Sequence, residues 1–191
     1  MKHLSTKKRD PRKVEDVKDC TLCPHLGNNY VASFGSDRAR LFIIGSAPSA
    51  NYLKYQNPFA GPAGELLGLL LESLDIEVED IYYSPAVKCR TPNGRMCRPA
   101  ELETCYNTWL KREIVKTRPT VLLLLGKEAY MTVFKKLEGF EHNITLTTAG
   151  GRTAIVGREP EYFIKIGAVD QFMELTAPLL TALSGVDKPE N

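Results

Sequence analysis

The sequence has no long hydrophobic run and no large excess of charge of either sign. Its longest apolar runs, Leu41–Ile44 and Val121–Leu125, are far shorter than the roughly 20 residues of a membrane-spanning helix. The 25 Lys and Arg residues and 23 Asp and Glu residues leave a net charge of +2, which alone does not indicate nucleic acid. No G-x-G-x-x-G or P-loop lysine motif occurs, which disfavours a nucleotide-binding α/β protein. We therefore expect a soluble, cytoplasmic protein with no membrane partner.

The 191 residues, 43% of them apolar, are enough for one ordinary globular domain. Residues 1–16 are rich in Lys and Arg and have no apolar period, which predicts a flexible basic arm. Residues 17–185 are predicted to form one domain, followed by a tail at 186–191. We expect a monomer.

Buried strands and helices alternate along the predicted domain. Continuous apolar runs predict strands at 40–45, 80–87 and 120–126, and helical spacing predicts helices at 66–74, 99–116, 127–137 and 170–183. Residues 144–166 are predicted to hold short strands and turns. This alternation favours an α/β protein with a parallel sheet and helices on both faces. Active sites in such folds lie at the carboxyl ends of the strands.

Five cysteines are present, which a reducing cytosol keeps as thiols. Cys20 and Cys23 form a C-x-x-C pair, Cys89 ends a predicted strand, and Cys105 follows in the next predicted helix. Four such thiolates supply an all-sulfur set, which selects zinc or an iron–sulfur cluster. Scattered buried cysteines are the alternative, and Cys97 is left over.

Five segments, in the same order, resemble the iron–sulfur uracil-DNA glycosylases, which form family 4 of the uracil-DNA glycosylase superfamily. The resemblance covers roughly residues 17–180. It rests on the C-x-x-C pair, the first loop Gly45–Ser49, the P-F-x-G-x-A-G-x-L-L segment Pro58–Leu67, the V-K-C-R segment Val87–Arg90 and the P-x-E…C helix Pro99–Cys105. It implies a three-layer α/β/α fold around a central, mainly parallel, four-stranded sheet.

The resemblance also implies a cofactor, a partner and a reaction. A [4Fe–4S] cluster would be held by Cys20, Cys23, Cys89 and Cys105, with zinc as the alternative metal. The partner would be DNA, duplex or single-stranded. Such enzymes flip a nucleotide, bind its base in a pocket and hydrolyse the N-glycosidic bond.

Three positions of the implied base pocket depart from the family pattern. Pro85 stands where the family has the Asn that reads the uracil edge, Glu159 replaces the His of the late H-P-x-Y-L motif, and Ser46 replaces the first-loop Glu. Proline has no side-chain donor or acceptor, and an ionised glutamate accepts hydrogen bonds but donates none. These changes predict that the accepted base is changed or that excision is abolished.

The resemblance assigns the remaining site residues by their place in the motifs. The predicted catalytic residues are Ser46, Asn51 and Glu159, with Asn51 as a candidate for holding water. The predicted base-binding residues are Ala47, Pro48, Phe59 and Pro85, with Phe59 as the stacking ring. The predicted DNA contacts are Gly61 and Gly64 at a helix N-terminus, Arg90, Arg95, Arg98 and Arg158, and Tyr162 and Phe163 as a wedge.

The sequence thus predicts a glycosylase-like [4Fe–4S] protein that excises a modified or other non-uracil base from DNA. The alternative is a catalytically inactive DNA-binding or partner-binding protein that keeps the fold and the cluster.

Overall fold

The computed structural model describes residues 16–23, 29–148 and 150–184. Nearly all of the predicted arm and the whole predicted tail fall outside these ranges. Within them, no helix is long and apolar enough to cross a membrane.

A six-stranded sheet forms the centre of the described structure, with the strand order β1-β3-β2-β4-β6-β5. Its strands are β1 (Phe34–Gly35), β2 (Leu41–Gly45), β3 (Ile81–Pro85), β4 (Val121–Leu125), β5 (Ile144–Thr147) and β6 (Thr153–Gly157). The four inner strands are parallel to one another, as predicted, and β1 and β5 add an antiparallel strand at each edge. The predicted sheet of four strands is therefore extended to six.

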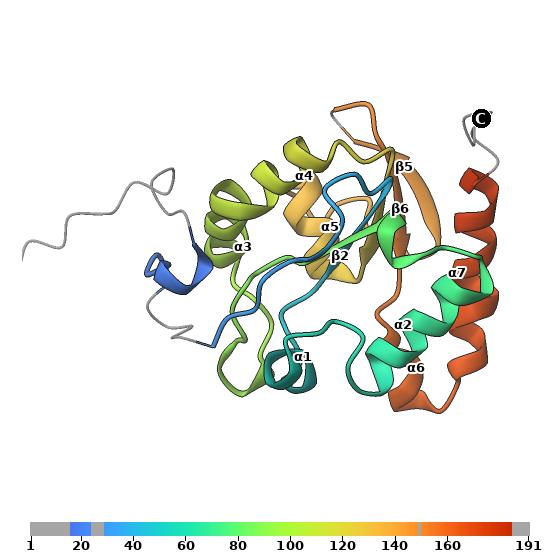
Figure 1. Cartoon of the computed structure of the whole chain (residues 1–191), viewed down its shortest axis with the longest axis horizontal. Coiled ribbons are helices and arrows are strands. Elements are labelled where there is room, and N and C mark those ends of the chain that lie inside the picture. The colour runs from blue at the N-terminus through green and yellow to red at the C-terminus, as the bar shows by residue number, and fades with distance from the viewer. Residues whose placement is uncertain (1–15, 24–28, 149, 185–191) are drawn as a thin grey trace, which may run out of the picture.

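Helices cover both faces of the sheet. They are α1 (Ala50–Tyr55), α2 (Pro62–Ser73), α3 (Pro99–Cys105), α4 (Lys111–Thr117), α5 (Lys127–Phe134), α6 (Pro160–Ile166) and α7 (Val169–Ser184), and a π-helical turn (Tyr106–Leu110) joins α3 to α4. Figure 1 shows α3, α4 and α5 on one side of the sheet and α2, α6 and α7 on the other. The three-layer architecture is confirmed.

Side chains that point alternately to the two faces of the sheet explain how each buried strand contacts both helix layers. Phe42 and Ile44 of β2 pack toward α3, α4 and α5, whereas Leu41 and Ile43 pack toward α2, α6 and α7. Successive strand residues point to opposite faces, so a strand buried on both sides must be apolar throughout. The sequence LFIIG meets this requirement, and all five residues are buried.

The segment 144–166 is only partly as predicted. It contains β5 and β6, but its last residues form the helix α6 rather than a strand or turn. Pro160 occupies the first turn of α6, where its missing N–H leaves no hydrogen bond unmade. Phe163 of α6 is 2% exposed and packs against Phe172 of α7.

A buried ion pair ties β3 and the residues after it to α4. The side chain of Lys88 is 2% exposed, and its ammonium lies 2.8 Å from the Glu113 carboxylate. The same ammonium donates to the hydroxyls of Ser84 and Ser33. Glu113 in turn accepts from both hydroxyls, at 2.9 Å and 2.6 Å. All four polar side chains therefore have hydrogen-bond partners.

Candidate active site

A cavity of about 570 Å³ opens at the carboxyl ends of the parallel strands. Its lining comes from the end of β2 and the loop after it (Gly45–Ser49), from α2, from residues 90–96 after β3, from the start of α5 and from Glu159–Glu161 at the start of α6. The chain ends of four parallel strands therefore contribute to one site, as the doubly wound fold predicts.

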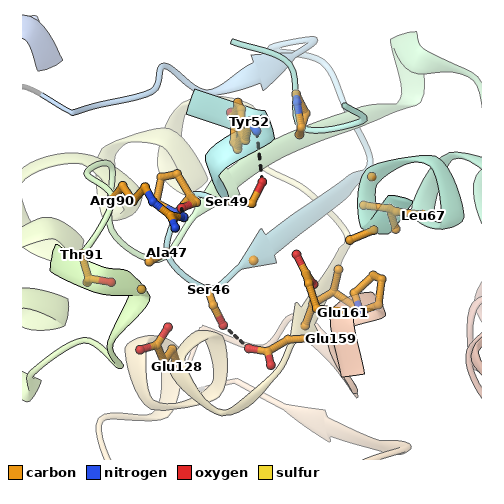
Figure 2. Close-up of a pocket in the computed structure, with 18 of the residues that line it drawn as sticks. Ser46, Ala47, Ser49, Tyr52, Leu67, Arg90, Thr91, Glu128, Glu159 and Glu161 are labelled. Carbon is orange, nitrogen blue, oxygen red and sulfur yellow. Dashed lines mark hydrogen bonds between the residues drawn. The ribbon is translucent and has the colours of Figure 1, made fainter. Parts of the chain in front are cut away.

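Ser46 and Glu159 form a hydrogen-bonded pair in this cavity. The Ser46 hydroxyl follows β2 directly and donates to Oε1 of Glu159, which follows β6 (Figure 2). Gly126, after β4, lies against the same carboxylate and has a φ of +89°. A Cβ at this position would overlap the Glu159 side chain, so glycine is what lets the carboxylate approach the strand ends.

Two other carboxylates of the cavity act on Glu159. Burial raises the pKa of Glu159 above its ordinary value, and the charges of Glu161 and Glu128 raise it further, whereas the Ser46 hydroxyl lowers it. Glu128 is buried and accepts the backbone N–H of Cys97. The result is a carboxylate at position 159 that takes up a proton more readily than an exposed glutamate.

The predicted arginines lie on the other walls or outside the cavity. The Arg90 guanidinium donates to the Pro48 carbonyl oxygen at 3.1 Å, and the Arg95 guanidinium pairs with both oxygens of Glu101. Both arginines line the cavity, together with Ala47 and Pro48. Arg98 is exposed just before α3 and is not part of the lining.

Three predicted pocket residues do not line the cavity. The ring of Phe59 packs edge-on against Phe34, with the ring centroids 5.6 Å apart, and borders a different depression. Asn51 is exposed, and its amide lies against Gly61. Pro85 is buried in the sheet opposite Gly45. The structure therefore does not bring Phe59, Asn51 and Pro85 together with Ser46 and Glu159 in the lining of this cavity, and their assigned roles stay predictions.

The residues predicted to face DNA lie in different environments. Phe163 is a core residue, which corrects its assignment to a wedge, since burial keeps its ring inside the molecule. Tyr162 is 40% exposed, and Arg158 lies over its ring at 4.3 Å. At the start of α2, Gly64 borders the cavity, whereas Gly61 does not.

All four predicted cluster ligands line one small cavity at the end of α3: Cys20, Cys23, Cys89 and Cys105. Burial and the neighbouring thiols raise the pKa of Cys23 and of Cys89 to about 11. The backbone N–H of Lys88 donates to Sγ of Cys105 at 3.2 Å. Cys97 is not part of this lining and contacts Glu128 instead.

The arrangement of these four thiols suits a multi-iron cluster better than a single metal ion. Within residues 16–23, 29–148 and 150–184, no three His, Cys, Asp or Glu side chains are grouped to hold a metal ion. The four ligands of a [4Fe–4S] cluster bind through the cluster and need not meet at one point. Thiols with raised pKa values become thiolates when metal binds and displaces their protons.

The site and the fold can now be compared with known proteins. A family model described as the Uracil DNA glycosylase superfamily matches residues 32–177, well over half of the chain. The chain belongs to this superfamily. The predicted membership is confirmed, and with it the fold class.

Three type-4 uracil-DNA glycosylases are similar to this superfamily member. The one from Archaeoglobus fulgidus is 34% identical over 123 residues, which are 63% of this chain and 61% of the relative. The one from Thermotoga maritima is 35% identical over 159 residues, 79% of this chain and 81% of the relative. The one from Saccharolobus solfataricus is 34% identical over 127 residues, which are 65% of this chain and 58% of the relative. The aligned part thus spans between 58% and 81% of these relatives.

Two residues that shape the site in this superfamily member were not among the predictions. They are Glu128 and Glu161. Glu128 lies in the first turn of α5, three residues after the correctly predicted strand β4 ends. Glu161 lies two residues after Glu159. Their positions just beyond the carboxyl ends of parallel strands were the available signal.

Proposed function

We propose that this chain is a DNA glycosylase that hydrolyses the N-glycosidic bond of a flipped base other than uracil. The Ser46–Glu159 pair carries the proposal, because it puts an acid–base group into a cavity at the strand ends of a superfamily member. The names of the relatives, uracil-DNA glycosylases, support DNA as the partner.

The composition of the cavity supports a base other than uracil. None of the described residues that line it is Asn, Gln or His. The edge of uracil presents both donors and acceptors, and an amide side chain matches both at once. A pocket without a matching amide leaves the uracil edge poorly paired. Such a loss of hydrogen bonds can lower the preference for uracil over other bases by several orders of magnitude.

The proposed reaction uses Glu159 in its ionised form. The C1′–N bond breaks, its electron pair goes to the base nitrogen, and positive charge develops on the sugar. The Glu159 carboxylate stabilises this charge and takes the proton of the water that attacks C1′. Ser46 donates to Oε1 of Glu159 and so holds the carboxylate in place.

The DNA strand is proposed to cross the side of the cavity that carries Arg90 and Arg95. Each of these side chains is already oriented, Arg90 by the Pro48 carbonyl and Arg95 by Glu101. Oriented guanidinium groups contact phosphates with little loss of side-chain freedom.

A panel of duplexes tests the proposed activity. Each duplex carries one uracil, deaminated purine, hydroxymethylated base or glucosylated base, and the formation of abasic sites is measured. We expect at least one modified base to be released about a hundredfold faster than uracil or more. Abasic sites in none of the duplexes, with DNA binding retained, would instead support an inactive homologue. Uracil released as fast as any other base would contradict the altered specificity.

We propose further that Cys20, Cys23, Cys89 and Cys105 hold a [4Fe–4S] cluster. Its role is structural: it joins the segment around Cys20 to the segment after β3 and to the end of α3. Hydrogen bonds to cluster sulfurs adjust such centres, and the Lys88 N–H supplies one to Cys105.

Replacing Cys89 with serine is expected to abolish the cluster. Anaerobically purified protein should contain about four iron and four sulfide per chain and absorb visible light broadly, and the C89S variant should have lost most of both. Cys97→Ser is the matched control, because this thiol lies outside the four-cysteine cavity. Colourless wild-type protein containing zinc, or equal loss in the two variants, would contradict the assignment.

A further inference from the structure

An exposed methionine lies at the rim of the cavity. Met96 is 58% exposed and belongs to the same lining as Ser46 and Glu159. Among the exposed large apolar residues in the part of the chain that the structure describes, Met96 is the one that lines this cavity. Single exposed apolar side chains are common on protein surfaces. The position beside the cavity, rather than exposure itself, therefore sets Met96 apart.

Carboxylates hold the residues on both sides of Met96. The Arg95 guanidinium pairs with both oxygens of Glu101, which lies in the first turn of α3. The backbone N–H of Cys97 donates to Glu128 in the first turn of α5, and Cys97 itself is buried. The loop is thus anchored on two helices, so its projecting side chain can press against DNA with little reorganisation of the loop.

Basic side chains surround this methionine. Arg95 precedes it, and the exposed Arg98 follows two residues later. Arg90 and Lys127 line the same cavity. Positive groups of this kind contact phosphates and fix the position of a protein on the duplex. An apolar tip between them meets the stacked bases, which is the arrangement of side chains that wedge DNA open.

The two aromatic residues predicted to form the wedge are less suited to this role. Phe163 is buried in the core. Tyr162 does not line the cavity, and its ring already has partners: the Phe163 ring lies 5.4 Å away, and Arg158 lies over its face. Inserting Tyr162 between bases would break these contacts, whereas Met96 is already open to solvent for more than half of its surface.

We infer that Met96 is the wedge that enters the base stack of DNA and fills the gap left by a flipped nucleotide. This inference rests on the proposed glycosylase function, which requires flipping, and adds the residue that opens the duplex. Methionine is among the side chains that unstack bases, and its flexible thioether adapts to irregular surfaces. Because a single strand has no base pair to open, Met96 should matter more for duplex DNA than for single strands.

Base release from duplex and single-stranded DNA measures the contribution of the wedge. Met96→Ala is expected to slow single-turnover release from the best duplex of the panel about tenfold more than release from the same strand without its complement. Met96→Leu should keep most of the duplex rate, because leucine is also an apolar wedge. Val115→Ala on α4 is the matched control, since Val115 is 61% exposed and lies outside the cavity lining. Equal slowing of M96A on both kinds of DNA, or no slowing, would overturn the inference.

A fluorescence measurement separates the wedge from the chemistry. The base analogue 2-aminopurine, placed beside the modified base, brightens when its stacking is lost, and fluorine at C2′ of the target sugar slows cleavage. We expect saturating wild-type protein to raise the fluorescence several-fold and M96A to lose most of this rise. No rise with wild-type protein, or a larger loss in Tyr162→Ala than in M96A, would overturn the inference. A rise that depends on Met96, without abasic sites in any duplex of the panel, would reject the enzyme and keep the wedge.

Discussion

Replacing Glu159 with glutamine is expected to slow base release by about a hundredfold or more, which is the usual contribution of a general base. Glutamine keeps the size of the side chain and an oxygen that accepts from Ser46, but it cannot take a proton from water. The measurement is single-turnover formation of abasic sites on the best substrate of the duplex panel. Glu174→Gln on the exposed face of α7 is the matched control and is expected to leave the rate unchanged.

The pH dependence of the same reaction gives a second readout of Glu159. The reaction needs the ionised carboxylate, so the rate falls as the pH drops through the pKa of this group. Burial and the neighbouring carboxylates raise that pKa above the ordinary 4.5, so the acid limb is expected at a higher pH than for an exposed glutamate. The limb should be missing from the residual activity of E159Q. An unchanged limb in E159Q would assign the titration, and the proton transfer, to another group.

Replacing Glu113 with leucine is expected to lower the free energy of unfolding by about 3–5 kcal/mol. The variant leaves the ammonium of Lys88, which is 2% exposed, without its carboxylate partner. The hydroxyls of Ser33 and Ser84 still accept from Lys88, but they supply no opposite charge. Denaturant-induced unfolding of the protein measures the loss.

The double variant Lys88→Met/Glu113→Leu separates the ion pair from the packing around it. Replacing both members of a buried ion pair by apolar side chains is often close to neutral, because no uncompensated charge remains. We therefore expect the double variant to be more stable than E113L. If the double variant is as unstable as E113L, the loss comes from packing, and the assigned role of the buried charge is wrong.

Much of the fold could be predicted because the inner strands are buried on both faces. A strand such as β4 has no solvent-facing side, so the run Val121–Leu125 is apolar throughout and is visible without any structural information. The edge strand β5 lacks this signal, since its Thr145 and Thr147 are exposed and its residues alternate. The helix α6 was missed because it follows Gly157 and begins at Pro160, and glycine and proline are equally typical of a turn.

The site was predicted less completely, because motif order does not determine where a side chain points. Ser46 and Glu159 are 113 positions apart and were assigned separately, yet the structure brings them into one hydrogen bond. Phe59 was placed by its motif, but its ring turns toward Phe34 on β1 instead of the cavity. Glu128 and Glu161 gave no motif signal, because a glutamate in the first turn of a helix is common for reasons of helix stability alone.

The strand order also bears on how this protein resists aggregation. The most apolar strands, β2 and β4, each have a hydrogen-bonded neighbour on both sides, and the edges are occupied by a strand of two residues and by the polar strand β5. Short or polar edges offer little template for pairing with another chain. Local opening that begins at an edge therefore frees the backbone of Phe34–Gly35 or of β5 first. The segments best able to form intermolecular sheets are exposed only when the centre of the sheet itself unfolds.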